Sequence, residues 1–394
     1  MRIFFSAGEP SGDQHAAHLI QELKSRHSNV VPEGFGGPEM KAEGCDLLFE
    51  LTQLAVMGFL RVVPMLARFR RLVIQAEAHF DAFPPDAVVL IDFPGFNWWI
   101  AKAAKKRGIP VYYYMPPQLW GWAPWRVRKV RKWVDRVFCA LPFEYNWYQQ
   151  RKVNATWVGH PFFDEVAAKQ LDSSLVAELR SHQAEERVVA VLPGSRDHEI
   201  ERNFPVMLKS IKRVAKHCPG VRWVVGNYKA EHADVCRALQ MEAGLDADVT
   251  YYTDRTSEVI EAADCCFMVS GSISLELLAR HTPGLVLYRV PTLGRMASKV
   301  LMTCEFITLT NLVAQREIMP EFISNGNPAK DIDGMAEVLI EWLTDSEALV
   351  QREQDMRALA ETAAVTGATQ RTAEYLLEEL ATVTDRQHSG NHAA

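Results

Sequence analysis

The chain has 394 residues, which is too long for one ordinary hydrophobic core and predicts two domains of roughly 150–200 residues each. Its composition, 48% apolar and 23% charged, is that of a soluble globular protein. The net charge of −6 is uneven: residues 1–180 carry 22 Lys and Arg against 18 Asp and Glu, whereas residues 181–394 carry 21 against 31. The first half is therefore the better candidate for an anionic surface or substrate, and the negative total disfavours a nucleic-acid partner.

Short apolar runs alternate with amphipathic stretches along the chain, which predicts an α/β fold with parallel sheets covered by helices. The expected strands are 2–6, 86–91, 110–114, 136–140, 187–192, 221–225, 248–251, 265–269 and 284–288. The expected helices include 14–26, 96–107, 200–217 and 229–242. Because ligands bind such sheets at the carboxyl ends of the strands, the corners after the strands are the candidate sites.

Two doubly wound domains are expected, 1–166 and 187–344, with the polar stretch 167–186 as their linker. We expect C-terminal helices over 345–384 to pack against the first domain or a partner subunit, and 385–394 to be disordered. The seven cysteines form no CxxC pair and no zinc-like spacing, so we expect free thiols in a reducing cytosol and no metal. No signal peptide and no stretch of 18 apolar residues is present, which predicts a cytoplasmic protein without a spanning helix.

The first corner follows strand 2–6 and contains Gly8, Glu9, Ser11, Gly12 and Asp13. The two glycines permit another group to approach the backbone closely. Ser11 or Asp13 can cap a helix that begins near residue 14, and a tight turn with such a cap is the simpler interpretation. Because Glu9 would repel a phosphate, the functional interpretation is a site for sugar hydroxyls.

The second corner is IDFPGFN, in which Asp92 ends a buried strand. One interpretation is that Asp92 only caps the following helix. The other is a general base whose pKa is raised because Phe93 and Phe96 shield the carboxylate from water.

Two further corners belong to the second domain. After strand 187–192 the chain reads Gly194, Ser195, Arg196, and an arginine there suits a diphosphate. A surface ion pair of Arg196 with Glu199 or Glu201 is the alternative.

After strand 265–269 the chain reads Ser270, Gly271, Ser272, and Glu276 follows about one helical turn later. The backbone N–H groups of this turn can hold a phosphate, and Glu276 can accept hydrogen bonds from a ribose diol. The alternative is an ordinary helix cap with Glu in the first turn.

Two stretches of the first domain mix aromatic and cationic residues, as interfacial membrane segments do. The first covers residues 56–74 and the second covers 120–133. Packed helices with solvated charges are the alternative, and RNA is the weakest interpretation. The candidate membrane residues are Arg61, Arg68, Arg70, Arg71, Trp120 and Trp122.

Nine short segments together resemble one family, the lipid-A-disaccharide synthases, which are glycosyltransferases of the GT-B fold with two Rossmann-like domains facing a central cleft. They lie in the family's order over about residues 1–325. The segments are AGEPSGD (7–13), LAVMGF (54–59), IDFPGFN (91–97), LWGW (119–122), LPFE (141–144), VGHP (158–161), LPGSR (192–196), SGSISLE (270–276) and LTNLVAQRE (309–317).

The resemblance implies an inverting transfer from UDP-2,3-diacylglucosamine to 2,3-diacylglucosamine 1-phosphate. The product would be the β-1,6-linked lipid A disaccharide 1-phosphate of lipopolysaccharide biosynthesis, with UDP released. The enzyme would be peripheral on the anionic inner face of the cytoplasmic membrane. The resemblance implies no metal or other cofactor, and it leaves a homodimer open.

The resemblance also implies roles for matching positions. It assigns Asp92 as the base, and Arg196 and Asn311 as residues required for activity. Gly194, Ser195, the turn at 270–272 and Glu276 would bind UDP. The first corner and Asn97 would shape the acceptor cleft.

The sequence departs from the family pattern at Gly95, at Pro116-Pro117-Gln118, at Ala123 and at Ser324. These positions concern acceptor recognition more than the chemistry. Another UDP-sugar enzyme of the same fold, such as a 2-epimerase, and a non-catalytic membrane-associated binding protein are the alternative functions.

Overall fold

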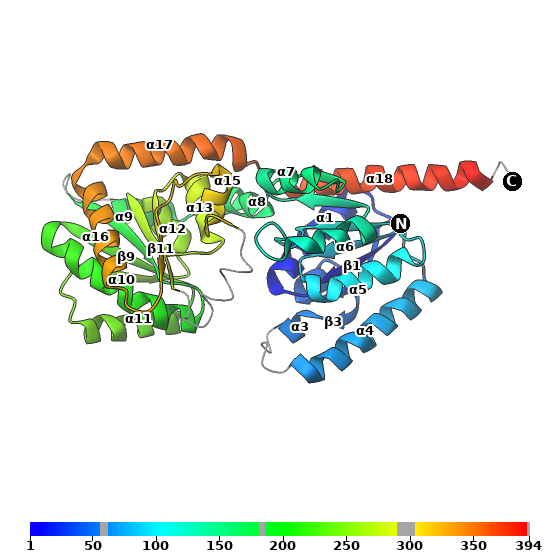
Figure 1. Cartoon of the computed structure of the whole chain (residues 1–394), viewed down its shortest axis with the longest axis horizontal. Helices are drawn as coiled ribbons and strands as arrows, with labels where there is room; N and C mark the ends of the chain where they lie inside the picture. Colours follow the sequence, from blue (N-terminus) through cyan, green and yellow to red (C-terminus); the bar gives the residue numbers. More distant parts are fainter. Residues whose placement is uncertain (56–61, 181–185, 290–303, 392–394) are drawn as a thin grey trace. The chain divides into compact units, whose positions relative to one another are not determined.

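The computed structural model describes residues 1–55, 62–180, 186–289 and 304–391 (Figure 1). The chain divides into two compact units: unit 1 comprises Met1–Asp164 and Thr366–Ala394, and unit 2 comprises Glu165–Val365. The chain leaves unit 1 within helix α8 (Pro161–Ala168) and returns between α17 (Ser346–Ala363) and α18 (Ala368–Asn391). Each unit holds one parallel sheet.

Unit 1 contains a seven-stranded sheet in the order β3-β2-β1-β4-β5-β6-β7. Strands β1 and β4 lie side by side near the centre of this sheet and run parallel. The residues that follow these two strands therefore lie at the same edge of the sheet. The strands are β1 (Arg2–Ala7), β2 (Val31–Gly36), β3 (Asp46–Glu50), β4 (Ala87–Ile91), β5 (Val111–Tyr114), β6 (Arg136–Cys139) and β7 (Ala155–Trp157).

Helices cover both faces of the unit 1 sheet because successive strand residues point to opposite sides. Phe4 packs on one face, against α4 (Val62–Ala82), α5 (Pro94–Lys105) and α6 (Val127–Trp133). Ile3 and Phe5 pack on the other face, against α1 (Pro10–Arg26) and the C-terminal helix α18. The other helices in the described residues of the unit are α2 (Pro38–Ala42), α3 (Thr52–Ala55), the 3₁₀ turn η2 (Pro124–Arg126) and α7 (Pro142–Gln150).

Unit 2 repeats this plan with six strands in the order β10-β9-β8-β11-β12-β13. Helices α10, α11, α16 and α17 contribute to one buried core. The strands are β8 (Arg187–Leu192), β9 (Val221–Asn227), β10 (Val249–Thr253), β11 (Cys265–Val269), β12 (Gly284–Arg289) and β13 (Glu321–Ser324). The helices are α9 (Ser173–Arg180), α10 (Asp197–His217), α11 (Ala230–Ala243), α12 (Thr256–Ala262), α13 (Ile273–Arg280), α15 (Leu309–Ala314), α16 (Ala329–Thr344) and α17.

The predicted α/β class with two doubly wound parallel sheets is confirmed, and all nine expected strands are present. Four strands, β2, β3, β7 and β13, were not predicted. β2 reads as a turn because it contains Pro32 and two glycines, and a side chain at Gly34 would overlap the Phe5 backbone. The other three are short and incompletely buried, so they lack the long apolar run of a central strand.

The stretch expected to be a linker, 167–186, contains α9, which belongs to unit 2. Of the expected C-terminal helices, α17 lies in unit 2, whereas α18 covers the unit 1 sheet and Arg136 of β6 pairs with its Glu379. Helix α18 extends to Asn391, into the segment expected to be disordered. No helix in the described ranges is long and apolar enough to cross a membrane.

Candidate active site

The corner after β4 is held in an unusual backbone conformation. Asp92 and Phe93 have φ values of 43° and 45°, in the left-handed region that few non-glycine residues adopt. The Asn97 side chain fixes this corner: its Nδ2 donates to the Asp92 carbonyl oxygen at 2.8 Å and its Oδ1 accepts from Ser6 Oγ at 2.6 Å. Tyr113 also donates to the Asp92 carbonyl, at 2.7 Å. Asn97 is completely buried, so it positions Asp92 and does not itself face a cleft, and its part in shaping an acceptor cleft stays a prediction.

The carboxyl group of Asp92 has an environment that suits a base. Burial, and then the nearby negative charge of Glu9, raise the pKa of Asp92 to about 6, although the Phe93 N–H lowers it. The predicted rise is therefore confirmed. At pH 7 such a group is mostly ionised yet basic enough to accept a proton.

Asp92 lines a cavity of about 430 Å³ in unit 1. Ser11 and Gly12 of the first corner line the same cavity, as does Gln118 of the segment that departs from the family pattern. The complete lining is Ser11, Gly12, His15, Ile91, Asp92, Pro94, Met115, Pro116, Pro117, Gln118, Leu119, Trp122 and Arg126. The structure thus joins the first and second corners into one pocket.

Two residues of the first corner serve the fold and not the pocket. Helix α1 begins at Pro10 and not near residue 14, so the expected cap by Ser11 or Asp13 is wrong. The buried Asp13 carboxylate accepts from the N–H groups of Gly37 at 2.7 Å and Met40 at 3.2 Å, which fixes the start of α2. A Cβ at Gly8 would overlap the Phe93 ring, so the close approach at Gly8 is made by Phe93 itself.

A pair of partly buried histidines beside the pocket was missed by sequence reasoning. Their rings lie 6.4 Å apart in an edge-to-face arrangement, and His15 lines the cavity. Burial first, and then a neighbouring histidine, lower the pKa of His15 to about 4 and that of His160 to about 3. Both rings are therefore neutral at pH 7 and can offer hydrogen bonds without charge. The sequence offered one indication of this pair: one histidine lies in the first helix, after the first corner, and the other lies in the VGHP segment.

The candidate membrane residues separate into exposed and buried ones. Arg68, Arg70 and Arg71 are exposed on α4, and Trp122 is exposed with the Arg126 guanidinium 4.3 Å from the centre of its ring. Arg61 lies outside the described residues.

Trp120 is a correction. It is buried, and its Nε1 donates to Glu144 Oε1 at 3.2 Å, so it packs inside unit 1 and cannot anchor the chain in a lipid surface. Burial raises the pKa of Glu144 to about 7 despite this hydrogen bond.

In unit 2 the corner after β8 carries an exposed arginine. Gly194 has φ of 126°, and the N–H of Ser195 donates to Glu199 Oε2 at 3.2 Å. Arg196 donates to Glu199 Oε1 at 2.8 Å, which is the surface ion pair of the alternative interpretation. The Arg196 side chain is 70% exposed, so an incoming anion can compete with Glu199 for it.

The corner after β11 combines an open turn with a buried acid. Gly271 and Ser272 are exposed, and Ser272 is the residue before α13. Glu276 is 6% exposed and accepts from Arg280 Nε at 3.0 Å. Strands β8 and β11 are neighbours, so both corners lie at one edge of the unit 2 sheet.

Asn311 is completely buried, and both ends of its amide are engaged. Its Nδ2 donates to Met319 O at 2.7 Å and Glu321 Oε1 at 2.8 Å, and its Oδ1 accepts from the N–H of Ile318 at 2.8 Å. In this conformation Asn311 holds the segment before β13 and does not face a substrate. The neighbouring Thr310 Oγ1 donates to Ser274 O at 2.8 Å, which ties α15 to α13.

Solved structures of other proteins share this fold. A UDP-GlcNAc 2-epimerase from Neisseria meningitidis bound to UDP-GlcNAc superposes with a TM-score of 0.61 at 13% identity, covering 96% of this chain and 99% of that one. The calicheamicin glycosyltransferase CalG4 superposes with a TM-score of 0.57 at 15% identity, covering 97% and 98%. The chain therefore has the GT-B fold of such glycosyltransferases and epimerases.

Sequence comparison identifies the family. A family model described as lipid-A-disaccharide synthetase matches residues 3–378. The lipid-A-disaccharide synthase of Myxococcus xanthus (strain DK1622) is 33% identical over 96% of this chain and 97% of its own length, and lipid-A-disaccharide synthase 1 of Legionella pneumophila (strain Lens) is 33% identical over 82% and 83%. The chain belongs to the lipid-A-disaccharide synthase family, and it is a glycosyltransferase of lipid A biosynthesis.

Proposed function

We propose that the chain transfers a diacylglucosaminyl group from UDP-2,3-diacylglucosamine to the 6-hydroxyl of 2,3-diacylglucosamine 1-phosphate, with inversion. The observation that carries the proposal is Asp92, a carboxylate with a pKa of about 6 at the carboxyl end of β4, in a cavity of about 430 Å³. An inverting transfer in one step needs such a base at the acceptor hydroxyl.

Asp92 accepts the proton of the acceptor 6-hydroxyl while that oxygen attacks C1 of the donor sugar. The bond between C1 and the diphosphate oxygen breaks, and UDP leaves with the electron pair. The neutral His15 ring lines the same cavity, where it would meet an acceptor hydroxyl.

The donor is bound by the two corners of unit 2. The turn at Ser270, Gly271 and Ser272 offers backbone N–H groups at the start of α13, and Arg196 supplies positive charge to the leaving diphosphate. Glu276 accepts hydrogen bonds from the ribose. Asn311 acts as a positioning residue for this side. Helix termini and arginine take the role that a metal has in other transferases, so we expect activity in the presence of a chelator.

Unit 1 carries the surface that meets the lipid. On α4, Leu66 and Ile74 are 60% and 55% exposed and share a helix face with Arg70. Trp99, Trp122 and Trp125 are also exposed on this unit. Exposed aromatic and aliphatic side chains beside arginine support docking on an anionic membrane, where both acylated substrates reside.

The test is mass spectrometry of the product formed by the purified chain from the two lipid-sugar substrates. We expect a disaccharide 1-phosphate and one UDP for each product molecule. Turnover of UDP-GlcNAc without a lipid acceptor would instead indicate an epimerase, and no UDP release with any acceptor would indicate a binding protein. The same assay with a chelator tests the metal-free chemistry.

A further inference from the structure

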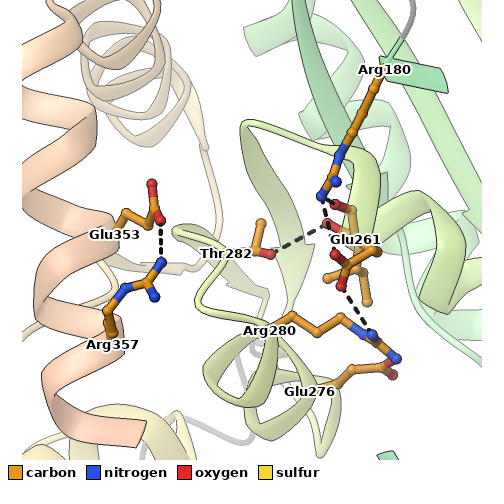
Figure 2. Close-up of polar contacts among 8 residues, drawn as sticks. Arg180, Glu261, Glu276, Arg280, Thr282, Glu353 and Arg357 are labelled. Carbon is orange, nitrogen blue, oxygen red and sulfur yellow. Dashed lines mark hydrogen bonds and ion pairs between the residues drawn. The ribbon is translucent and has the colours of Figure 1, made fainter. Parts of the chain in front are cut away.

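A line of alternating charges runs from the surface of unit 2 to Glu276 (Figure 2). Arg180 of α9 donates to Glu261 Oε1 of α12 at 3.1 Å. Arg280 of α13 donates through Nη1 to Glu261 Oε2 at 3.1 Å and through Nε to Glu276 Oε1 at 3.0 Å. The side chains of Arg280 and Glu276 are 9% and 8% exposed, whereas that of Arg180 is 55% exposed.

The geometry divides the guanidinium of Arg280 between two carboxylates. Its Nε reaches one oxygen of Glu276, so the contact is end-on and not bidentate. Among the hydrogen bonds of the described residues, the one to Glu276 comes from Arg280 and reaches a single carboxylate oxygen, Oε1. Glu261 accepts hydrogen bonds from two arginines, Arg180 and Arg280. Glu261 therefore anchors the Arg280 guanidinium on the side away from Glu276.

We propose that Arg280 is a positioning residue that holds Glu276 in the orientation required to accept hydrogen bonds from the nucleotide ribose. The proposal rests on the proposed function, in which Glu276 binds the ribose of UDP. It adds that Glu261 and Arg280 form the support for that acid, and that this support extends to the surface at Arg180.

The physical reason is the burial of the pair. A buried carboxylate without a partner is strongly disfavoured, so Glu276 would turn toward water if Arg280 were removed. Residues four apart lie on one face of a helix, so Arg280 can reach Glu276 without distorting α13. Lysine has a single ammonium group and cannot donate to both carboxylates in the fixed fork geometry of arginine.

The experiment measures the affinity of the full chain for UDP and for 2′,3′-dideoxy-UDP, which lacks the ribose diol, by calorimetric titration. The wild type should prefer UDP by roughly 10–100-fold. In Arg280→Gln the affinity for UDP should fall by about tenfold or more, while the affinity for the dideoxy nucleotide stays within about twofold of the wild type. A merely structural role would weaken both nucleotides together.

Two further variants keep the test decisive if Arg280→Gln folds poorly. Glu261→Gln, which leaves the Arg280–Glu276 pair in place but loosens its anchor, should lose part of the preference for UDP. Arg280→Lys should show less than half of the wild-type preference for UDP over the dideoxy nucleotide, when the preference is expressed as the logarithm of the affinity ratio. The matched control is Arg357→Gln, which removes an i,i+4 pair with Glu353 on α17 that is about half exposed and should leave both affinities unchanged.

The outcomes separate the two proposals. A wild type that binds no UDP contradicts the proposed function. A wild type that binds UDP and the dideoxy nucleotide equally removes the ribose role of Glu276 and, with it, the role of Arg280. A wild-type preference that is retained in Arg280→Gln and Glu261→Gln, or an equal loss of both nucleotides, overturns the positioning role alone.

Discussion

The two units use the same corner, a parallel strand followed by a turn and a helix, but they treat its carboxylates in opposite ways. In unit 1, Asp92 has no ion-pair partner among the described residues, and burial raises its pKa to about 6. In unit 2, Glu199 and Glu276 each hold an arginine. An unpaired, partly desolvated acid can exchange a proton near neutral pH, whereas a paired acid keeps a fixed charge. The difference suits unit 1 for proton transfer and unit 2 for binding.

The largest effect should come from removing the unpaired acid. We expect Asp92→Asn to lower kcat by roughly 10²–10⁴, the range of a lost acid–base group, with donor affinity nearly unchanged. Asparagine tolerates the left-handed backbone at this position, so the corner should persist. Steady-state kinetics gives kcat for the wild type and for Asp92→Asn. The control is Asp81→Asn, which changes an exposed acid of the same unit. A variant that retained more than a third of the wild-type kcat would exclude the role.

The surface of unit 1 should differ from that of unit 2 in binding lipid. Replacing Arg68, Arg70 and Arg71 by Ser should reduce affinity for anionic vesicles by up to about 3 kcal/mol, at about 1 kcal/mol for each cation. High salt should mimic the loss, and UDP affinity should stay unchanged. Co-sedimentation measures it. The control removes the same charge from unit 2 at three exposed arginines, Arg237, Arg316 and Arg357. Equal losses in the two triple variants would contradict a membrane face on unit 1.

The paired acid of unit 2 should matter for affinity and not for proton transfer. We expect Glu276→Ala to weaken UDP binding by roughly 1–3 kcal/mol, because ribose hydroxyls and Arg280 both lose a charged acceptor. Calorimetric titration gives the value, and Asp92→Asn serves as the control that should bind UDP normally. An unchanged affinity for UDP would count against the assignment of Glu276.

Sequence reasoning recovered the strands of the sheet centres and the position of Asp92, because buried parallel strands are long apolar runs and the residue at their end is easily seen. It failed where a side chain acts on a distant segment. Nothing local in the sequence indicates that Asp13 fixes α2, that Gly8 makes room for Phe93, or that Trp120 is buried on Glu144.

The same limit applies to the roles in the site. Asn97 and Asn311 stand in segments that resemble the family, and that resemblance could not distinguish contact with a ligand from support of the backbone. In this structure the buried amides of both residues hydrogen-bond to the backbone, which is the geometry of support. Arg280 lay outside every quoted segment, and only the fold places it against Glu276.

The pH dependence should also separate the two kinds of acid. Because the pKa of Asp92 is raised to about 6, its basic form is present above that pH and is lost as the pH falls through it. We expect kcat to be level above about pH 7 and to fall about tenfold for each pH unit below 6. UDP affinity should change far less across this range. A kcat profile that stays flat down to pH 5 would remove Asp92 as the base.

The smallest effect concerns stability, and it has the opposite sign to the effect on activity. A carboxyl group whose pKa is higher in the folded chain than in the unfolded one begins to destabilise the fold as the pH rises above the unfolded value, and the full effect is reached above the folded value. The rise from 3.8 to about 6 at Asp92 sets a ceiling of roughly 3 kcal/mol, and a buried asparagine amide still carries part of the desolvation cost. Asp92→Asn should therefore stabilise the protein by roughly 1 kcal/mol at pH 7.5. The gain should shrink as the pH falls below 6 and vanish below about pH 3, where Asp92 is protonated in both states. Urea unfolding of the wild type and of Asp92→Asn at pH 7.5 and at acid pH measures this gain in stability.

Glu276→Gln provides the comparison in unit 2. It breaks a buried ion pair and should instead destabilise the chain at pH 7.5. If Asp92→Asn were as destabilising as Glu276→Gln at pH 7.5, the carboxylate would have a stabilising partner in the folded chain, and the contrast between the two units would fail.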